Sequence, residues 1–125
     1  MSRLLDTSVL IDYLNGEPKA RAVLEDGSPR AVSVVTWLEV MSLAPEAVAE
    51  QTRGFLRTFE RLSVSEAVAD EALRLMGVHP GLPYHRALTW ACARVNKITW
   101  VTSDARNLPK HAADIEVPYR WPAAS

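Results

Sequence analysis

The first fourteen residues constrain the fold of this chain more than any other stretch. Two leucines lead into Asp6, and Thr7 and Ser8 precede an apolar pattern with helical spacing. The pattern predicts a buried strand that ends at Asp6 and a helix that Thr7 or Ser8 caps. Open α/β sheets bind ligands at the carboxyl ends of their strands, so Asp6 is the first candidate for chemistry. In the competing interpretation, Asp6 only accepts hydrogen bonds from the N–H groups at the start of this helix.

Short apolar runs alternate with helical patterns along the rest of the chain. Further strands are predicted at 31–35, 62–64, 98–102 and 115–117. A short helix starts at Glu17-Pro18, and further helical patterns fall near 36–44, 45–60, 65–76 and 84–95. Strands that alternate with helices favour a parallel sheet covered by helices on both faces. We expect a single α/β domain over residues 1–118, with a mainly parallel sheet of four to five strands and a C-terminal tail at 119–125.

Composition narrows the class of protein. Hydrophobic residues make up 48% of the 125 residues and charged residues 23%, which is typical of a globular domain. The chain has no apolar run long enough to span a membrane and no signal-peptide pattern at its start. Cys92 is the only cysteine, which excludes an internal disulfide and a cysteine zinc cluster. We therefore expect a cytoplasmic protein with no membrane partner.

Three acids stand at comparable positions relative to the predicted strands. Asp6 ends the first strand, Glu39 follows the second, and Asp104 follows the strand at 98–102. In a right-handed parallel arrangement all three lie at the same edge of the sheet. Carboxylate oxygens are the ligands that Mg²⁺ prefers, and a bound ion can activate water against a phosphodiester. The pattern therefore predicts a metal site.

Each acid also has a purely structural interpretation. Thr36-x-x-Glu39 matches a capping box, which explains a glutamate there without any catalysis. Asp104 can be an ordinary turn aspartate. Asp12 lies beyond the strand end, on the first helix, and we expect it to be solvated. The combination of three acids favours the metal site, whereas no single acid does.

Positive charge is concentrated in one segment, although the whole chain has a net charge of −1. Residues 83–111 contain five cationic side chains and one aspartate, a net charge of +4. Such a segment is either a phosphate-binding face or a solvated helix face that acids elsewhere balance. These two interpretations remain open from the sequence.

Three motifs together resemble the PIN-domain family, and within it the VapC-type toxins of bacterial toxin–antitoxin pairs. The motifs are Leu5-Asp6-Thr7-Ser8-Val9-Leu10-Ile11, Thr36-Trp37-Leu38-Glu39-Val40 and Val101-Thr102-Ser103-Asp104-Ala105-Arg106-Asn107-Leu108. The resemblance runs from the first strand to about Val117. It implies an α/β/α sandwich and a metal-dependent ribonuclease that uses Mg²⁺ or Mn²⁺, forms a homodimer and is blocked by a small antitoxin protein.

The resemblance also implies roles for individual residues. Asp6, Glu39 and Asp104 match the family's catalytic metal ligands. Thr7, Thr102 and Asn107 match positions that support such a site.

One position departs from the family pattern. Family members carry an aspartate where this chain has Arg86, at the start of the helical pattern at 84–95. Exchanging a carboxylate for a guanidinium changes the local charge by about +2, since arginine stays protonated. We expect weaker metal binding, or one ion only.

Three hypotheses follow for Arg86. The guanidinium binds the scissile phosphate of RNA in a working enzyme, or the nuclease is dead and the domain serves as an RNA-binding or antitoxin-binding module. In the third hypothesis Arg86 is autoinhibitory and pairs with Asp6 or Asp104.

Overall fold

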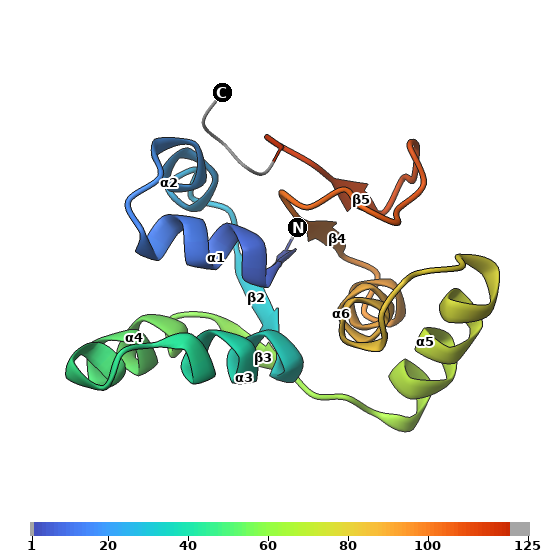
Figure 1. The fold of residues 1–125 in the computed structure, drawn as a ribbon, viewed down its shortest axis with the longest axis horizontal. Coiled ribbons are helices and arrows are strands. Elements are labelled where there is room, and N and C mark those ends of the chain that lie inside the picture. Colours follow the sequence, from blue (N-terminus) through green and yellow to red (C-terminus); the bar gives the residue numbers. More distant parts are fainter. Residues whose placement is uncertain (1, 121–125) are drawn as a thin grey trace.

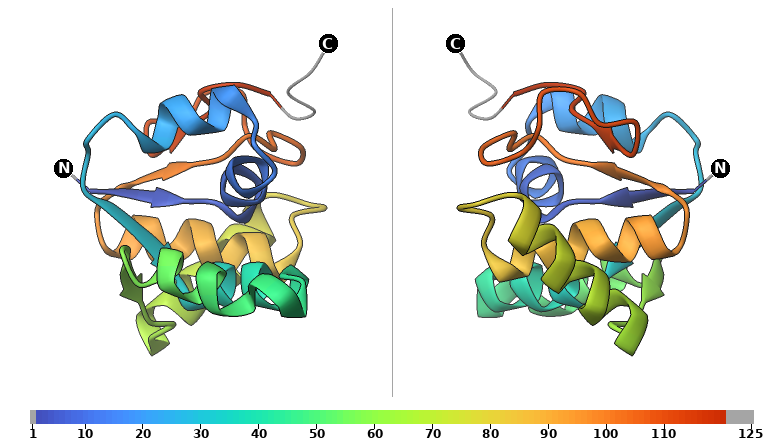
Figure 2. Two further views of the ribbon diagram at one scale, coloured as in Figure 1. Left: turned by 90° about the vertical axis from the view of Figure 1, so that its left-hand side faces the viewer. Right: turned by 90° about the vertical axis from the view of Figure 1, so that its right-hand side faces the viewer.

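The computed structural model describes residues 2–120 of the chain (Figure 1). Five strands form one sheet in the order β3-β2-β1-β4-β5, and every neighbouring pair is parallel. The strands are β1 (Arg3–Leu5), β2 (Arg30–Ser33), β3 (Glu60–Leu62), β4 (Thr99–Val101) and β5 (Ile115–Glu116). Figure 2 shows β1 and β4 side by side and running in the same direction. The predicted α/β class and parallel sheet are confirmed.

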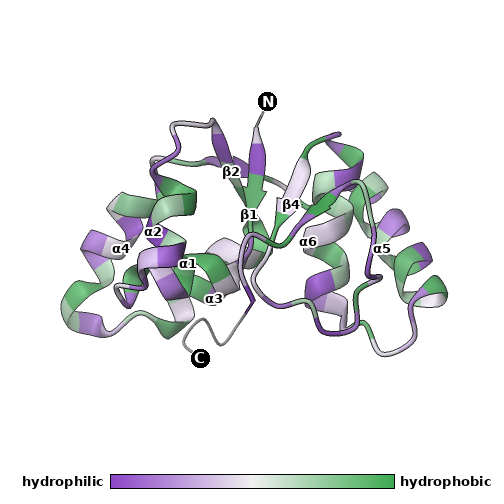
Figure 3. Cartoon of the chain, turned by 90° about the horizontal axis from the view of Figure 1, so that it is seen from above, coloured by the Kyte–Doolittle hydropathy of each residue, from purple (hydrophilic) through white to green (hydrophobic). Residues whose placement is uncertain are grey.

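Helices cover both faces of the sheet. They are α1 (Thr7–Leu14), α2 (Pro18–Leu24), α3 (Val34–Leu43), the 3-10 turn η1 (Glu46–Val48), α4 (Ala49–Leu56), α5 (Glu66–Val78) and α6 (Tyr84–Val95). Figure 3 shows α1 to α4 on one side of the strands and α5 and α6 on the other. No helix within residues 2–120 is long and apolar enough to cross a membrane.

Alternating side chains of the central strands build two cores. Leu4 and Trp100 point into the core against α5 and α6, and both are fully buried. Their neighbours Leu5 and Val101 point into the core that α1 to α4 cover. Successive residues of a strand face opposite sides of the sheet, so these short strands are buried on both faces.

The start of α3 differs from the prediction. The β-branched side chains of Val34 and Val35 predict that the strand continues through them, but α3 already begins at Val34. Ser33 is the N-cap, and its hydroxyl accepts a hydrogen bond from the Thr36 N–H at 3.0 Å. The cap therefore lies three residues before Thr36, and the predicted Thr36–Glu39 capping box does not form.

Other element boundaries also differ between the sequence prediction and the structure. The helix predicted over 45–60 begins as η1 and continues as α4, which ends at Leu56, and β3 then occupies 60–62 rather than 62–64. Ser65 caps α5 through its hydroxyl, and α6 covers 84–95 as predicted. Trp121 and the predicted fraying end at 122–125 lie outside the described residues.

Candidate active site

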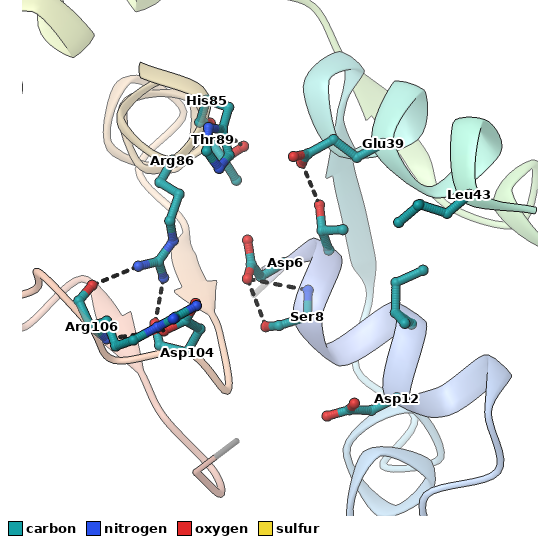
Figure 4. A pocket seen from close by; sticks show the side chains of 12 residues that line it. Asp6, Ser8, Asp12, Glu39, Leu43, His85, Arg86, Thr89, Asp104 and Arg106 are labelled. Carbon is teal, nitrogen blue, oxygen red and sulfur yellow. Dashed lines mark hydrogen bonds and ion pairs between the residues drawn. The ribbon is translucent and has the colours of Figure 1, made fainter. Parts of the chain in front are cut away.

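The predicted site residues gather around one pocket where the strands end (Figure 4). The pocket has a volume of about 410 Å³ and lies between α1, α3, α6 and the loop after β4. Its lining residues are Asp6, Thr7, Ser8, Ile11, Asp12, Glu39, Leu43, His85, Arg86, Thr89, Asp104 and Arg106. The fold therefore brings the three predicted acids and Arg86 to one cavity. Thr102 and Asn107 lie outside this lining.

Asp6 lies directly after β1 and is itself the N-cap of α1. Its Oδ2 accepts hydrogen bonds from the Ser8 N–H at 3.3 Å, the Ser8 hydroxyl at 2.7 Å and the Thr102 hydroxyl at 2.8 Å. The prediction that Thr7 or Ser8 caps this helix is wrong, because Asp6 supplies the cap. All three bonds fall on one oxygen, so the carboxylate is fixed while no described side chain forms an ion pair with it.

Glu39 reaches the pocket from the middle of α3. Its Oε1 accepts a 2.6 Å hydrogen bond from the Thr7 hydroxyl, which joins α3 to the first turn of α1. The half-buried carboxylate has no ion-pair partner among residues 2–120. Because Ser33 caps α3, the structural explanation for a glutamate at this position no longer applies.

Asp104 is engaged by a neighbour in its own loop. Both carboxylate oxygens accept hydrogen bonds from the Arg106 guanidinium, at 2.9 and 2.7 Å, and Oδ1 also accepts the Arg106 N–H at 3.1 Å. These bonds to Arg106 hold the pKa of the Asp104 carboxyl below its ordinary value, and the positive charge of Arg86 adds to the effect. Arg106 itself is 77% exposed. The third acid is thus already paired, on a face open to solvent.

Arg86 is buried and holds the backbone of the same loop. Its guanidinium donates to the carbonyl oxygens of Asp104 and Arg106, the latter at 2.7 Å, and lies 5.1 Å from the centre of the Trp100 ring. Among the described residues no ion pair joins it to the Asp6 or Asp104 carboxylate. The charge of Arg86 therefore lies beside the pocket while its N–H groups are committed to the loop.

The two supporting residues outside the lining differ in their surroundings. Thr102 is fully buried, and its hydroxyl donates to Asp6 and accepts the Asp104 N–H at 3.1 Å, so it connects two of the acids. Asn107 has a left-handed backbone with φ 62°. A Cβ added to Gly81 would lie 3.3 Å from the Asn107 side-chain oxygen, which places Asn107 against the loop before α6.

Asp12 is buried, contrary to the expectation that it is solvated. It is 8% exposed, and its Oδ2 accepts a 2.8 Å hydrogen bond from the Tyr119 hydroxyl. Burial, together with the adjacent Asp12 carboxylate, raises the pKa of Tyr119. The bond fixes residue 119, predicted as the start of a tail, against α1 at the edge of the pocket.

The carboxylates suit one hydrated ion better than a three-acid cage. Within residues 2–120, no group of three His, Cys, Asp or Glu side chains is close enough to hold a metal ion. Asp6, Asp12 and Glu39 line the pocket without an ion pair among the described residues, and Asp12 accepts the Tyr119 hydroxyl, whereas Asp104 is paired with Arg106. Mg²⁺ is commonly bound by one or two carboxylates with several waters. The residues present therefore fit a single ion on Asp6 and Glu39.

Several residues of the site were not identified from the sequence. Arg106 stands two residues after Asp104 in a turn, and that spacing could have indicated the ion pair. The contact of Asp12 with Tyr119 joins residues 107 positions apart and leaves no local signal. His85 and Thr89 lie one turn apart on α6 and reach the pocket beside Arg86 (Figure 4).

Comparison with known proteins identifies the class to which this fold and site belong. The PIN domain family model matches residues 3–114. A chain of a toxin–antitoxin complex from Klebsiella pneumoniae is 30% identical with a TM-score of 0.86, and the match covers 94% of this chain and 98% of that one. This chain therefore belongs to the PIN-domain family. No curated protein sequence matches it.

Other solved structures place the chain among the VapC-like members. VapBC-5 from Mycobacterium tuberculosis is 25% identical with a TM-score of 0.62, over 95% of this chain and 98% of that one. DNA-bound VapBC from Salmonella typhimurium is 21% identical with a TM-score of 0.72, over 93% and 97%, and shows the likeness of fold alone. The protein is a PIN domain that resembles VapC toxins.

Proposed function

We propose that this protein is a metal-dependent endoribonuclease of the VapC toxin type that uses one Mg²⁺ or Mn²⁺ ion. The observation that carries the proposal is that Asp6 and Glu39 line one pocket with Arg86 and Arg106 while, among the described residues, neither carboxylate forms an ion pair or, like Asp12, accepts the Tyr119 hydroxyl. When bound, the ion would polarise a phosphoryl oxygen and activate water.

The protein's own residues position the acids for this role. The Ser8 and Thr102 hydroxyls hold one oxygen of Asp6, and the Thr7 hydroxyl holds Glu39. Such hydrogen bonds orient ligating carboxylates and commonly contribute about 10- to 100-fold to metal affinity or activity. Arg86 fixes the loop that carries Asp104, and its charge favours the phosphate of an RNA substrate.

RNA cleavage by the purified protein tests the proposal. A fluorescently labelled single-stranded RNA is incubated with Mg²⁺ or Mn²⁺, and we expect Asp6→Asn and Glu39→Gln to abolish cleavage, as removal of the ion by a chelator does. Asp70→Asn, an exposed position on α5, is the matched control and keeps full activity. Cleavage that survives in Asp6→Asn contradicts this assignment of the site.

A second candidate function rests on the two arginines. Arg86 replaces the family's aspartate, and Arg106 neutralises Asp104, so a degenerate domain that binds RNA or an antitoxin without cleaving is also consistent with the site. It predicts that the protein binds RNA with equal affinity before and after Asp6→Asn and never cleaves it. Cleavage that depends on Asp6 excludes this alternative.

We infer that the partner of this protein is a small antitoxin and that the toxin is a cytoplasmic homodimer. The support is the similarity to a toxin–antitoxin complex over 94% of the chain. Co-expression with the small protein encoded beside it, followed by co-purification and sedimentation analysis, tests both points. A protein that remains monomeric and leaves the neighbour's product unbound contradicts them.

A further inference from the structure

A second hollow surface lies beside the acid pocket. Two pockets of about 810 and 670 Å³ flank the connection between β4 and β5. They share Pro109, His111, Ala112 and Ala113, so the same connection lines both hollows. We call these two adjoining hollows together the basic groove and define it by Lys97, Lys110, His111 and Arg120 in their lining.

The charge of the basic groove is strongly one-sided. Its lining contains a single carboxylate, that of Asp114, and four cationic side chains, which are Arg94, Lys97, Lys110 and Arg120. Asp114 is already occupied, since it accepts hydrogen bonds from Arg94 and from the Trp90 N–H, both at 2.9 Å. Lys97, Lys110 and Arg120 form no ion pair within residues 2–120. The groove therefore presents uncompensated positive charge on a protein whose net charge is −1.

The basic groove begins where the acid pocket ends. Asp104 and Arg106 line the acid pocket, and Ala105 between them lines the groove. Figure 1 shows the connection between β4 and β5, drawn in orange to red, on the side of the sheet that carries α5 and α6. A phosphodiester chain seated at Asp6 and Glu39 can thus continue past Arg106 toward Lys110 and Lys97.

We propose that the basic groove binds single-stranded RNA on one side of the phosphodiester at the acid pocket. The inference rests on the proposed ribonuclease function and adds to it the path of the substrate. Lys97, Lys110 and Arg120 contact phosphates, and binding releases the counterions of the strand. His111, which is exposed and belongs to both pockets, adds a planar ring against which a base can stack.

Binding measurements with a cleavage-deficient protein test the groove. All proteins carry Asp6→Asn, and their affinity for a fluorescent single-stranded RNA is measured by anisotropy across a series of salt concentrations. Lys97→Ala with Lys110→Ala removes two phosphate contacts, so the slope of log K against log salt falls by about 1.4. The matched control is Arg21→Ala with Arg57→Ala, two exposed arginines outside the groove, which removes the same net charge.

The expected result is weaker binding and a shallower slope in the groove variant alone, with an unchanged thermal unfolding midpoint. Equal effects in groove and control variants overturn the proposal, because they show only nonspecific attraction. A groove effect on duplex DNA larger than that on RNA also overturns it.

Cleavage assays separate this inference from the proposed function. In the protein with Asp6 intact, we expect the groove variant to raise KM for a long RNA and to cleave a dinucleotide at the normal rate. Groove-dependent RNA binding without any cleavage supports the groove and contradicts the nuclease. Asp6-dependent cleavage of long RNA that the groove variant leaves unchanged supports the nuclease and contradicts the groove.

Discussion

Arg86 and Arg106 carry the same charge at the site but bind different groups. Arg86 is 8% exposed and binds backbone carbonyls, whereas Arg106 is mostly exposed and binds the Asp104 carboxylate. Replacing Arg86 removes the donors to two carbonyl oxygens of the loop after β4, and replacing Arg106 frees the Asp104 carboxylate. Their substitution should therefore affect different properties, folding stability in one case and metal binding in the other.

Substitution of Arg86 is expected to destabilise the fold. In Arg86→Met the carbonyl oxygens of Asp104 and Arg106 lose their donor, which costs about 2–3 kcal/mol of unfolding free energy. Arg86→Lys keeps the charge but not the planar fork, so it loses a smaller amount. Urea unfolding measures both values. A loss no larger than that of the exposed control Arg57→Met contradicts the role of Arg86 as a clamp on the loop.

Substitution of Arg106 is expected to strengthen metal binding. Arg106→Ala removes the competitor for both oxygens of Asp104, and the Asp104 carboxylate then becomes available at the pocket. Mn²⁺ affinity, measured by titration calorimetry, should rise by about tenfold or more. Arg57→Ala is the control for the loss of one positive charge. An unchanged affinity would show that Asp104 does not take part in holding the ion.

Among the helices, α5 and α6 are connected to the edge of the sheet by a network of ion pairs. Glu71 on α5 accepts hydrogen bonds from Arg74 at 2.7 Å and from Arg94 on α6 at 3.3 Å, and Arg94 also pairs with Asp114 before β5. The bonds from Arg74, followed by those from Arg94, hold the pKa of the Glu71 carboxyl below its ordinary value of 4.5. The chain links two helices to the edge of the sheet that borders the basic groove.

This network should make stability depend on pH. Because the pKa of Glu71 is lowered on folding, the unfolded chain binds more protons at acidic pH, and stability falls as pH drops through that lowered value. Glu71→Gln should cost up to about 1 kcal/mol above pH 4.5, since the arginines are partly exposed, and almost nothing at pH 2. Urea unfolding at both pH values measures the difference. An equal cost at both pH values assigns the loss to packing instead of charge.

Elements with strong local signals could be predicted from the sequence, and the others depended on contacts. The strand before Asp6, the helix α5 and the helix α6 were predictable from apolar periodicity, although the pattern placed Ser65 inside α5 and the structure makes it the N-cap. The start of α3 was not, because Val34 and Val35 favour a strand locally while Ser33 caps a helix in the fold. Strand propensity is a weak signal when a capping residue next to it starts a helix.

The candidate site was predictable to a similar degree. Positions after the predicted strands identified Asp6, Glu39 and Asp104, and all three line the pocket, Glu39 from the middle of α3. The pairing of charges at the pocket was not predictable, because Arg86 binds backbone carbonyl oxygens whereas Arg106 binds the Asp104 carboxylate. Pairings of this kind are set by rotamers and loop backbone, which sequence spacing does not specify.

In the molecule as a whole, one parallel sheet lies between two hydrophobic cores and positions the acid pocket next to the basic groove. The cores on its two faces hold β1 and β4 rigidly, and the loops after these strands carry the acids at a single edge. The long connection from β4 to β5 carries cations away from that edge. The acid pocket and the basic groove thus share one loop. An ion at the pocket is expected to stabilise the whole fold, because it binds only the folded protein.

Thermal unfolding with and without Mn²⁺ tests this coupling. An ion that binds only the folded protein adds about 2.7 kcal/mol of stability at a hundred times its Kd, which raises the unfolding midpoint by several degrees. We expect the rise in the unmodified protein, none in Asp6→Asn, and a larger rise in Arg106→Ala at the same concentration. Asp70→Asn, which changes the net charge equally at an exposed position of α5, should behave as the unmodified protein does. A full rise in Asp6→Asn would place the ion at another site and remove Asp6 from its ligands.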